Sequence, residues 1–277
     1  MITETYNIMP FTSDHISGAL GLSQAAGWPH RAEDWAMLLS VSKGMVAMDG
    51  DQIVATALVT PYGDVATVNM IIVDEKARGK GLGRKIMASA MALISPHEWR
   101  LIATVSGRPL YEKMGFKVTG EIMQLQGHSN PLSTHEISGD DLSWATLDDM
   151  DNLLMQDWAA TGLKRYNLFK YFGKMAKVVV LNGHNGFGVL RDFGQGQVIG
   201  PVVAKSIEDA KKIYSFLLNT SAGVFVRTDV LGNENLSIWL EQQGLERVDQ
   251  PISMAYGSSG SPKSDLEVFA ITSQALA

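Results

Sequence analysis

The feature that most restricts the fold of this chain is a glycine-rich, cationic segment, "DEKARGKGLGRKI". It follows the apolar run Val68–Val73 ("VNMIIV"), which has the composition of a buried strand. After the segment, apolar residues recur at helical spacing, at Leu82, Ile86 and Ala90. Between a strand and a helix, glycines let successive backbone N–H groups converge on an anion at the positive end of the helix. The sequence therefore predicts an α/β fold with an anion-binding loop.

The spacing of the glycines distinguishes among three anion-binding patterns. A P-loop needs Ser or Thr after its Lys, and "GKGLGRKI" has neither. A dinucleotide fingerprint needs Gly-x-Gly-x-x-Gly, whereas the glycines here are Gly79, Gly81 and Gly83. The pattern Arg/Gln-x-x-Gly-x-Gly/Ala is met by Arg78, Gly81 and Gly83, and it suits a pyrophosphate. The alternative is a flexible, solvated loop whose cations are incidental.

Composition narrows the classes of protein. A length of 277 residues favours two domains, and no apolar run reaches the roughly 18 residues of a membrane span. No signal-peptide pattern is present, so we expect a cytoplasmic protein without a membrane partner. The chain has no cysteine, and no two of its six histidines lie three or four residues apart, so we expect no metal site. A net charge of −6 argues against a nucleic-acid partner.

Periodicity predicts that the first half of the chain begins with two helices, which are followed by a run of strands with two further helices among them. The expected helices are 13–28, 32–42, 82–94 and 108–114, and the expected strands are 44–48, 53–60, 66–73, 100–105 and 116–125. This order predicts a mixed α/β sheet. The polar stretch 127–141 is rich in Ser, Gly and Pro, so we expect it to be a linker between domains 1–126 and 142–277.

The second half is predicted to repeat this order of elements. The expected helices are 146–160, 165–175, 206–218 and 234–243, and the expected strands are 177–182, 187–193, 197–204, 223–230 and one near 247–257; residues 266–272 could add another. The two halves are either an internal repeat or two generic α/β units that are similar by chance. The second half lacks the glycine loop. Its counterpart, "VIGPVVAKSIEDAKK", begins a helix with Glu208 and Asp209, which would repel a pyrophosphate.

The pair of motifs "NMIIVDEKARGKGLGRKIM" and "GRPLYEKMGF" closely resembles the GNAT acyltransferase family, whose members transfer an acetyl group from acetyl-CoA. The resemblance covers Met45 to about Met123, and the preceding helices more loosely. It implies a mostly antiparallel sheet flanked by helices, and acetyl-CoA as co-substrate. It also implies that the cofactor is bound by Ile71, Ile72, Val73, Arg78, Gly79, Lys80, Gly81, Leu82, Gly83 and Arg84. Thr104 stands where members commonly carry an Asn, which leaves one cofactor contact open.

The resemblance assigns the catalytic role to Tyr111. When an amine attacks the thioester, the departing thiolate is best protonated as it leaves, and a phenol with an ordinary pKa of about 10 can donate that proton at neutral pH. The alternative is that Tyr111 is a core aromatic residue whose hydroxyl has a structural partner. The general base stays open between a carboxylate and a chain of water molecules.

The acceptor site is expected in the stretch "GWPHRAEDW", where the family places its substrate-covering helices. Trp28 and Trp35 could form an apolar wall, and Asp34 or His30 could pair with a polar or cationic acceptor. Alternatively, the Trp residues are core and the carboxylates are solvated. We expect direct transfer in a ternary complex to the primary amine of a small molecule, since no cysteine is present to carry the acyl group. A CoA-binding sensor without turnover, and an O-acyl or longer-chain acyltransferase, are the alternatives.

The second half is expected to be a degenerate GNAT-like domain. Alignment of "LYEKMGF" with "WLEQQGL" on their glycines places Leu240 opposite Tyr111, and leucine has no proton to donate. We therefore expect this half to cover or complete the acceptor site without chemistry of its own. Two such halves could mimic a family dimer within one chain, so the protein is expected to be a monomer or a homodimer.

Overall fold

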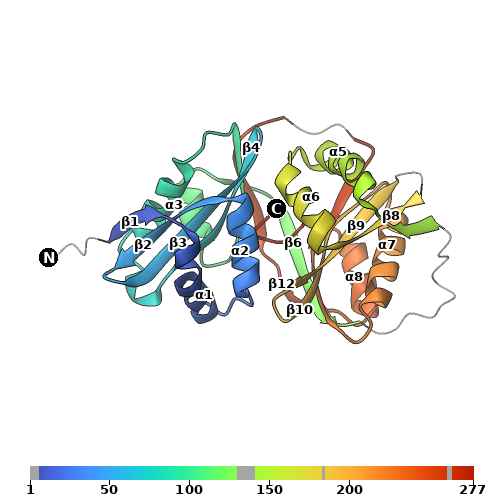
Figure 1. The fold of residues 1–277 in the computed structure, drawn as a ribbon, viewed down its shortest axis with the longest axis horizontal. Coiled ribbons are helices and arrows are strands. Elements are labelled where there is room, and N and C mark those ends of the chain that lie inside the picture. The colour runs from blue at the N-terminus through green and yellow to red at the C-terminus, as the bar shows by residue number, and fades with distance from the viewer. Residues whose placement is uncertain (1–5, 130–140, 183–184, 261–263) are drawn as a thin grey trace.

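The computed structural model of the protein describes residues 6–129, 141–182, 185–260 and 264–277. It contains two lobes side by side, with the C-terminus between them (Figure 1). The helices are α1 Ile16–Ala25, α2 Ala32–Val41, α3 Leu82–Met91, α4 Arg108–Lys113, α5 Met150–Thr161, α6 Tyr166–Met175, α7 Ile207–Thr220 and α8 Glu234–Gln242. The strands are β1 Asn7–Pro10, β2 Lys43–Asp49, β3 Gln52–Tyr62, β4 Val65–Val73, β5 Glu98–Ala103, β6 Lys117–His128, β7 Leu142–Trp144, β8 Lys177–Leu181, β9 Gly186–Phe193, β10 Gly196–Ala204, β11 Phe225–Leu231, β12 Glu246–Asp249, β13 Ile252–Gly257 and β14 Glu267–Ala270.

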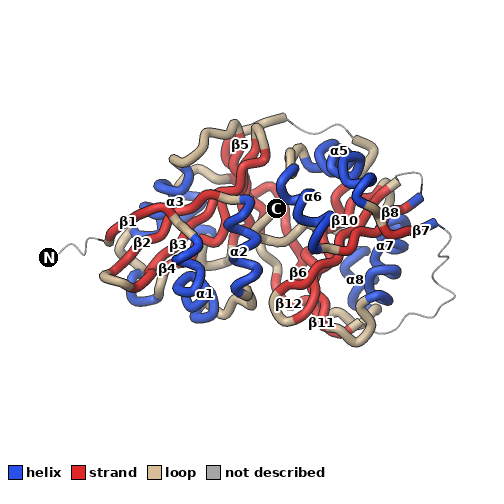
Figure 2. The backbone as a smooth tube through the Cα atoms, viewed as in Figure 1, coloured by secondary structure: helices blue, strands red, loops and turns tan. Residues whose placement is uncertain are grey.

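The strands form one continuous mixed sheet. Its order is β1-β2-β3-β4-β5-β13-β6-β11-β14-β10-β9-β8-β7, and β12 pairs with β6 beside this path. Among the described pairs, β4 with β5 and β10 with β11 are parallel, and the others are antiparallel. Figure 2 shows the helices against the faces of this sheet. The predicted fold class, a mixed and mostly antiparallel sheet flanked by helices, is confirmed.

The two halves exchange their last long strands. The first part of β6 pairs with β13, from Lys117 opposite Ala255 to Glu121 opposite Ile252, whereas its second part pairs with β11. In turn β13, from the second half, pairs with β5 of the first half. The boundary expected after residue 126 therefore falls inside β6, and residues 127 and 128 belong to a strand rather than to a linker. Most of the expected linker lies at 130–140, outside the described residues.

The helices divide the apolar side chains into three main cores. Helix α3 packs on β2, β3 and β4 and buries Leu82, Ile86 and Met87 in the core of the first lobe. Residues of α1, α2, α5 and α6 share a second core that joins the two lobes, and α7 and α8 bury the third against the second half of the sheet. None of the helices within the described residues is both long enough and apolar enough to span a membrane.

Candidate active site

The parallel strands β4 and β5 separate at the centre of the first lobe. They pair only from Val65 opposite Glu98 to Thr67 opposite Arg100. Beyond this point β4 contains a bulge. The register against β3 shifts between Thr56 and Leu58, so that two residues of β4 lie opposite a single residue of β3. Met70, in the bulge, has a φ of 49°, a strained value for a side chain other than glycine. The bulge turns the main chain around Ile71 toward the gap between the strands, where an extended ligand could form hydrogen bonds.

The glycine loop joins the open end of this gap to α3. Gly79 and Gly81 have φ values of 78° and 81°, which favour glycine, and a Cβ at either position would meet no atom within 4 Å. Open space therefore surrounds the backbone where the first-turn amides of α3 lack intrahelical acceptors. Gly83 lies inside α3, and a Cβ there would make ordinary contacts of 3.4 Å with Leu110 and 3.5 Å with Val73. At Gly83, only the close approach of a ligand would require glycine.

The cations of the loop are exposed around this helix terminus. Arg78, Lys80 and Arg84 are all exposed, and the first turn of α3 contains no acidic residue. The Arg78 Nε donates a 3.0 Å hydrogen bond to the Val73 carbonyl, which ties the loop to the end of β4. Positive side chains beside uncapped amides at a helix N-terminus fit a pyrophosphate. The residues present thus fit the diphosphate and the extended arm of acetyl-CoA.

Tyr111 lies on the other side of the gap, in the short helix α4. Its ring is buried, 6 % exposed, and meets Phe116 edge to face with the ring centroids 6.4 Å apart. Gly107 leaves room for the ring, since a Cβ there would lie 3.0 Å from the Tyr111 hydroxyl. Burial raises the pKa of Tyr111 to about 12, so the phenol keeps its proton at neutral pH. Thr104 lies beside it, and its hydroxyl accepts the Gly107 N–H at 3.2 Å.

A pocket of about 460 Å³ opens where the two lobes meet, and both halves line it. The first half contributes Trp28, His30, Met70, Ile71, Thr104 and Tyr111, among others. The second half contributes Phe193 and Gln197 near the β9–β10 turn, Arg227 of β11, Asp249 at the end of β12, and Ser273–Ala275 near the C-terminus. The proposed acid and the bulge of β4 therefore share one cavity with residues more than a hundred positions later in the chain.

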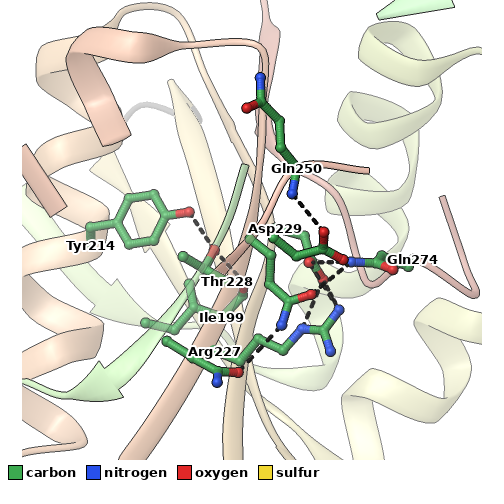
Figure 3. Close-up of polar contacts among 10 residues, drawn as sticks. Ile199, Tyr214, Arg227, Thr228, Asp229, Gln250 and Gln274 are labelled. Atoms are coloured by element: carbon green, nitrogen blue, oxygen red, sulfur yellow. Dashed lines mark hydrogen bonds and ion pairs between the residues drawn. The ribbon is translucent and has the colours of Figure 1, made fainter. Parts of the chain in front are cut away.

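A polar network from three separate segments, shown in Figure 3, includes three residues that line this cavity: Gln124, Arg227 and Gln274. The Arg227 guanidinium donates from Nη2 and Nε to the fully buried carboxylate of Asp229, at 2.9 to 3.3 Å. The Gln274 amide donates to Asp229 at 3.1 Å and to Gln124 of β6 at 3.0 Å. Reasoning from the sequence missed these residues. Polar side chains at alternate positions of the apolar strands β6 and β11 were the available signal.

Two of the four acceptor-site residues expected from the sequence line the pocket, namely Trp28 and His30. The His30 ring contacts Phe193 edge to face at 5.2 Å between centroids, and its Nδ1 has no hydrogen-bond partner among the described residues. Burial lowers the pKa of His30 to about 4, because Asp34 only partly offsets the loss of solvation and the nearby Arg227 and Arg191 lower the pKa further. The imidazole is therefore neutral at physiological pH.

The other two residues, Trp35 and Asp34, are not among the residues that line the pocket. Trp35 is fully buried, stacks on Phe11 at 5.6 Å and donates to the Ser23 hydroxyl at 3.1 Å. Asp34 accepts hydrogen bonds from Arg31 at 2.9 to 3.1 Å and from the Gly194 N–H at 3.2 Å. Burial alone would raise the pKa of Asp34, but these bonds outweigh burial and hold it below its usual value. Both side chains thus have partners within the fold.

In the second half, the chain itself fills the corresponding gap. Strands β10 and β11 pair from Gln197 to Ile199 and then separate, and β14 lies between their ends, paired with both. The backbones are so close that a Cβ at Gly200 would lie 2.1 Å from the Ile271 carbonyl oxygen. Helix α7 begins with a Ser206 cap that accepts the Asp209 N–H at 3.1 Å, and two acidic residues lie in its first turn. The features that fit acetyl-CoA in the first half are thus replaced in the second.

Comparison with known proteins agrees with this architecture. Models of the acetyltransferase (GNAT) domain match residues 41–118 and, separately, residues 154–270. The chain is 28 % identical over 274 residues to an uncharacterized N-acetyltransferase, YitH, of Bacillus subtilis, with 95 % of each chain covered. A putative acetyltransferase from Pyrococcus horikoshii has a similar structure, with a TM-score of 0.83, 19 % identity and coverage of 98 % of this chain and 96 % of that one. A tandem GNAT protein of the clavulanic acid pathway has a TM-score of 0.62 at 14 % identity, covering 93 % and 100 %.

The chain belongs to the GNAT acetyltransferase family and contains two GNAT domains. The resemblance noted in the sequence is thereby confirmed, and the protein is an acyltransferase of the GNAT type. The similarity of the two halves is an internal repeat rather than a chance likeness of α/β units.

Proposed function

We propose that this enzyme transfers an acetyl group from acetyl-CoA to the primary amine of a small molecule by direct attack in a ternary complex. The observation that carries the proposal is the pocket of about 460 Å³ in which Tyr111 and the bulge of β4 meet the second half. Its volume suits a small acceptor, and both lobes enclose it. A protein substrate would need a more open groove than a cavity walled by two lobes.

Tyr111 is proposed as the general acid. As the amine nitrogen bonds to the acetyl carbon and the carbon–sulfur bond breaks, the sulfur gains an electron pair and takes the phenolic proton. A phenol whose pKa burial raises to about 12 remains a donor throughout the neutral range. The main chain near Ile71 and the loop from Arg78 to Arg84 are proposed to hold the acetyl-CoA arm and its pyrophosphate.

Water is proposed as the base that removes the proton from the acceptor amine. Among the described residues that line the pocket, Asp249 at the end of β12 is the single carboxylate, and its side chain is exposed. His30 is a poor base because its pKa is lowered to about 4. Trp28 and His30 are therefore proposed to shape the acceptor site rather than to transfer protons.

The second domain is proposed to be degenerate in cofactor binding and to supply one wall of the acceptor site. Three observations support this: β14 fills its gap, α7 begins with acidic residues, and Leu240 of α8 is buried in the core. Strand exchange between β6 and β13 supplies within one chain the pairing that a second copy could provide, which favours a monomer.

The test is release of free CoA from acetyl-CoA in the presence of a panel of small amines. Amine-dependent thiol release, with the acetylated amine found by mass spectrometry, would support the proposal. Tight acetyl-CoA binding without turnover of any amine would favour a CoA-binding sensor. Turnover of alcohols, or a preference for longer acyl-CoA, would favour the other acyltransferase classes.

A further inference from the structure

Two arginines of the second domain lie together beside Phe193, a residue of the pocket wall. Arg191 of β9 and Arg227 of β11 are both register partners of Val198 in β10, so their side chains lie on the same face of the sheet. Both guanidinium groups contact the ring of Phe193, which lines the pocket, with Cζ to centroid distances of 5.3 Å and 5.6 Å. Arg227 itself lines the pocket.

Of these two guanidinium groups, only that of Arg227 has a carboxylate partner among the described residues. Asp229 takes the Nε and Nη2 edge of Arg227, so the N–H groups on Nη1 point away from Asp229. Arg191 is 4 % exposed; its Nη1 donates a 3.4 Å hydrogen bond to the Asp192 carbonyl, and its Nε and Nη2 have no hydrogen-bond partner among the described residues. The nearby carboxylate of Asp34 already accepts hydrogen bonds from Arg31 and Gly194. His30 adds no balancing negative charge.

A buried charge without a partner is costly and points to a ligand that supplies one. Burial lowers the pKa of Arg191 to about 10, yet the guanidinium stays charged at neutral pH. The pyrophosphate is not the partner, because the loop from Arg78 to Arg84 is not part of the pocket lining. The acceptor is the remaining ligand that enters this cavity.

We propose that the acceptor carries a carboxylate besides its amine, and that Arg227, with Arg191 beside it, binds this carboxylate. The inference rests on the proposed function and specifies its substrate class as an amino-acid-like amine. The amine would face Tyr111 on the wall from the first half, and the carboxylate would face Arg227 on the wall from the second, with Arg191 beside it. A carboxylate suits the wall better than a doubly charged phosphate, because Asp229 and Asp249 already place negative charge there.

The experiment compares amines with and without the carboxylate: lysine with cadaverine, tyrosine with tyramine, and histidine with histamine. At least one carboxylate-bearing member should have a kcat/KM roughly tenfold or more above its decarboxylated partner, the size expected of a good charged contact. Arg227→Gln should raise the KM of that substrate by about tenfold, and leave the KM of the decarboxylated partner and of acetyl-CoA within about twofold. Arg191→Met, which keeps an apolar side chain of similar length, should also raise the KM of the carboxylate-bearing substrate.

Two further variants separate charge recognition from folding. Arg227→Lys retains the positive charge and should recover part of the lost affinity. Arg247→Gln alters an arginine of β12 that pairs with Glu234 outside the pocket lining, and should change neither substrate preference nor KM. Loss of activity on both members of a pair in Arg227→Gln, in step with a lower melting temperature, would overturn the inference.

The outcome for the inference is distinct from the outcome for the proposed function. Turnover of amines without any preference for the carboxylate would refute the inference and leave the acetyltransferase proposal intact. If no amine is turned over, calorimetric titration of the same pairs into the protein with CoA decides the question. Binding of carboxylate-bearing members that Arg227→Gln abolishes would support the inference, and equal or absent binding of both members would refute it.

Discussion

Replacement of Tyr111 by Phe tests the proposed acid, because it removes one hydroxyl and keeps the ring. The ring is 6 % exposed and packs edge to face on Phe116, contacts that phenylalanine preserves. We expect kcat to fall on the order of 10²-fold, about 2.7 kcal/mol in the barrier, which is the lower end of what a general acid contributes. The free energy of unfolding should change by less than about 1 kcal/mol.

The assay measures thiol release at saturating acetyl-CoA and acceptor, with calorimetric titration of acetyl-CoA alongside. Affinity for acetyl-CoA should change by less than about twofold, since the phenol is proposed to act in the transition state. Tyr214→Phe is the matched control. Its ring is also buried and its hydroxyl bonds Thr228 at 2.7 Å, so the variant should lose about 1 kcal/mol of stability and retain its kcat.

The pH dependence adds a second check on Tyr111. Since burial raises its pKa to about 12, the phenol is protonated from pH 6 to 10, and Tyr111 should cause no fall in kcat across that range. A wild-type kcat that falls near pH 8 in step with ionisation of Tyr111, followed by ultraviolet absorbance, would contradict this assignment. Near-normal turnover in Tyr111→Phe, or equal losses of kcat in Tyr111→Phe and Tyr214→Phe, would show that Tyr111 is not the general acid.

Further outcomes follow from the loop, the second domain and the buried residues. Gly81→Val should weaken acetyl-CoA binding roughly tenfold, because φ is 81° at this position and disfavours a side chain. Gly21→Ala in α1 is the control and should leave the affinity unchanged. Equal affinities of wild type and Gly81→Val for acetyl-CoA, measured by calorimetry, would show that the loop does not bind the cofactor. Titration of the full chain should find one acetyl-CoA, and two equivalent sites would refute the degenerate second domain. Asp34→Asn should lower stability by about 1–3 kcal/mol with the acceptor KM unchanged. Because the pKa of Asp34 is lowered in the folded state, Asp34 stabilises the fold at pH values above its pKa in the unfolded chain. This stabilisation should be lost as the pH falls through the pKa of the folded state. Denaturant unfolding of wild type and variant at pH 7 and pH 3 measures the difference. Trp35→Ala should cost about 3–5 kcal/mol, and a loss below 1 kcal/mol would contradict its core position.

Local interactions made the first lobe and its loop predictable. The glycine spacing after an apolar strand depends on φ values and helix-terminal amides within a few residues, and Gly79 and Gly81 have the left-handed values that this role needs. Helical periodicity identified α3, and the acidic start of α7 was visible as a capped helix. Tyr111 could be proposed because a motif and its chemistry lie within one short segment. That assignment stays a prediction.

What lies opposite Tyr111 was decided only by tertiary structure. Strand pairing joins residues more than a hundred positions apart, and period-2 patterns say which face is apolar but not which strand is the neighbour. Neither the exchange of β6 and β13 nor the insertion of β14 between β10 and β11 has a local signal. Trp28 and Trp35 look alike in sequence, yet one lines the pocket and the other is fully buried. The sequence by itself was enough to predict a pyrophosphate-type loop and a candidate acid, because both predictions depend on residues within one short segment. The polar network of Arg227, Asp229 and Gln274 beside the pocket exists only because distant strands pair, and pairing is a property of the whole fold.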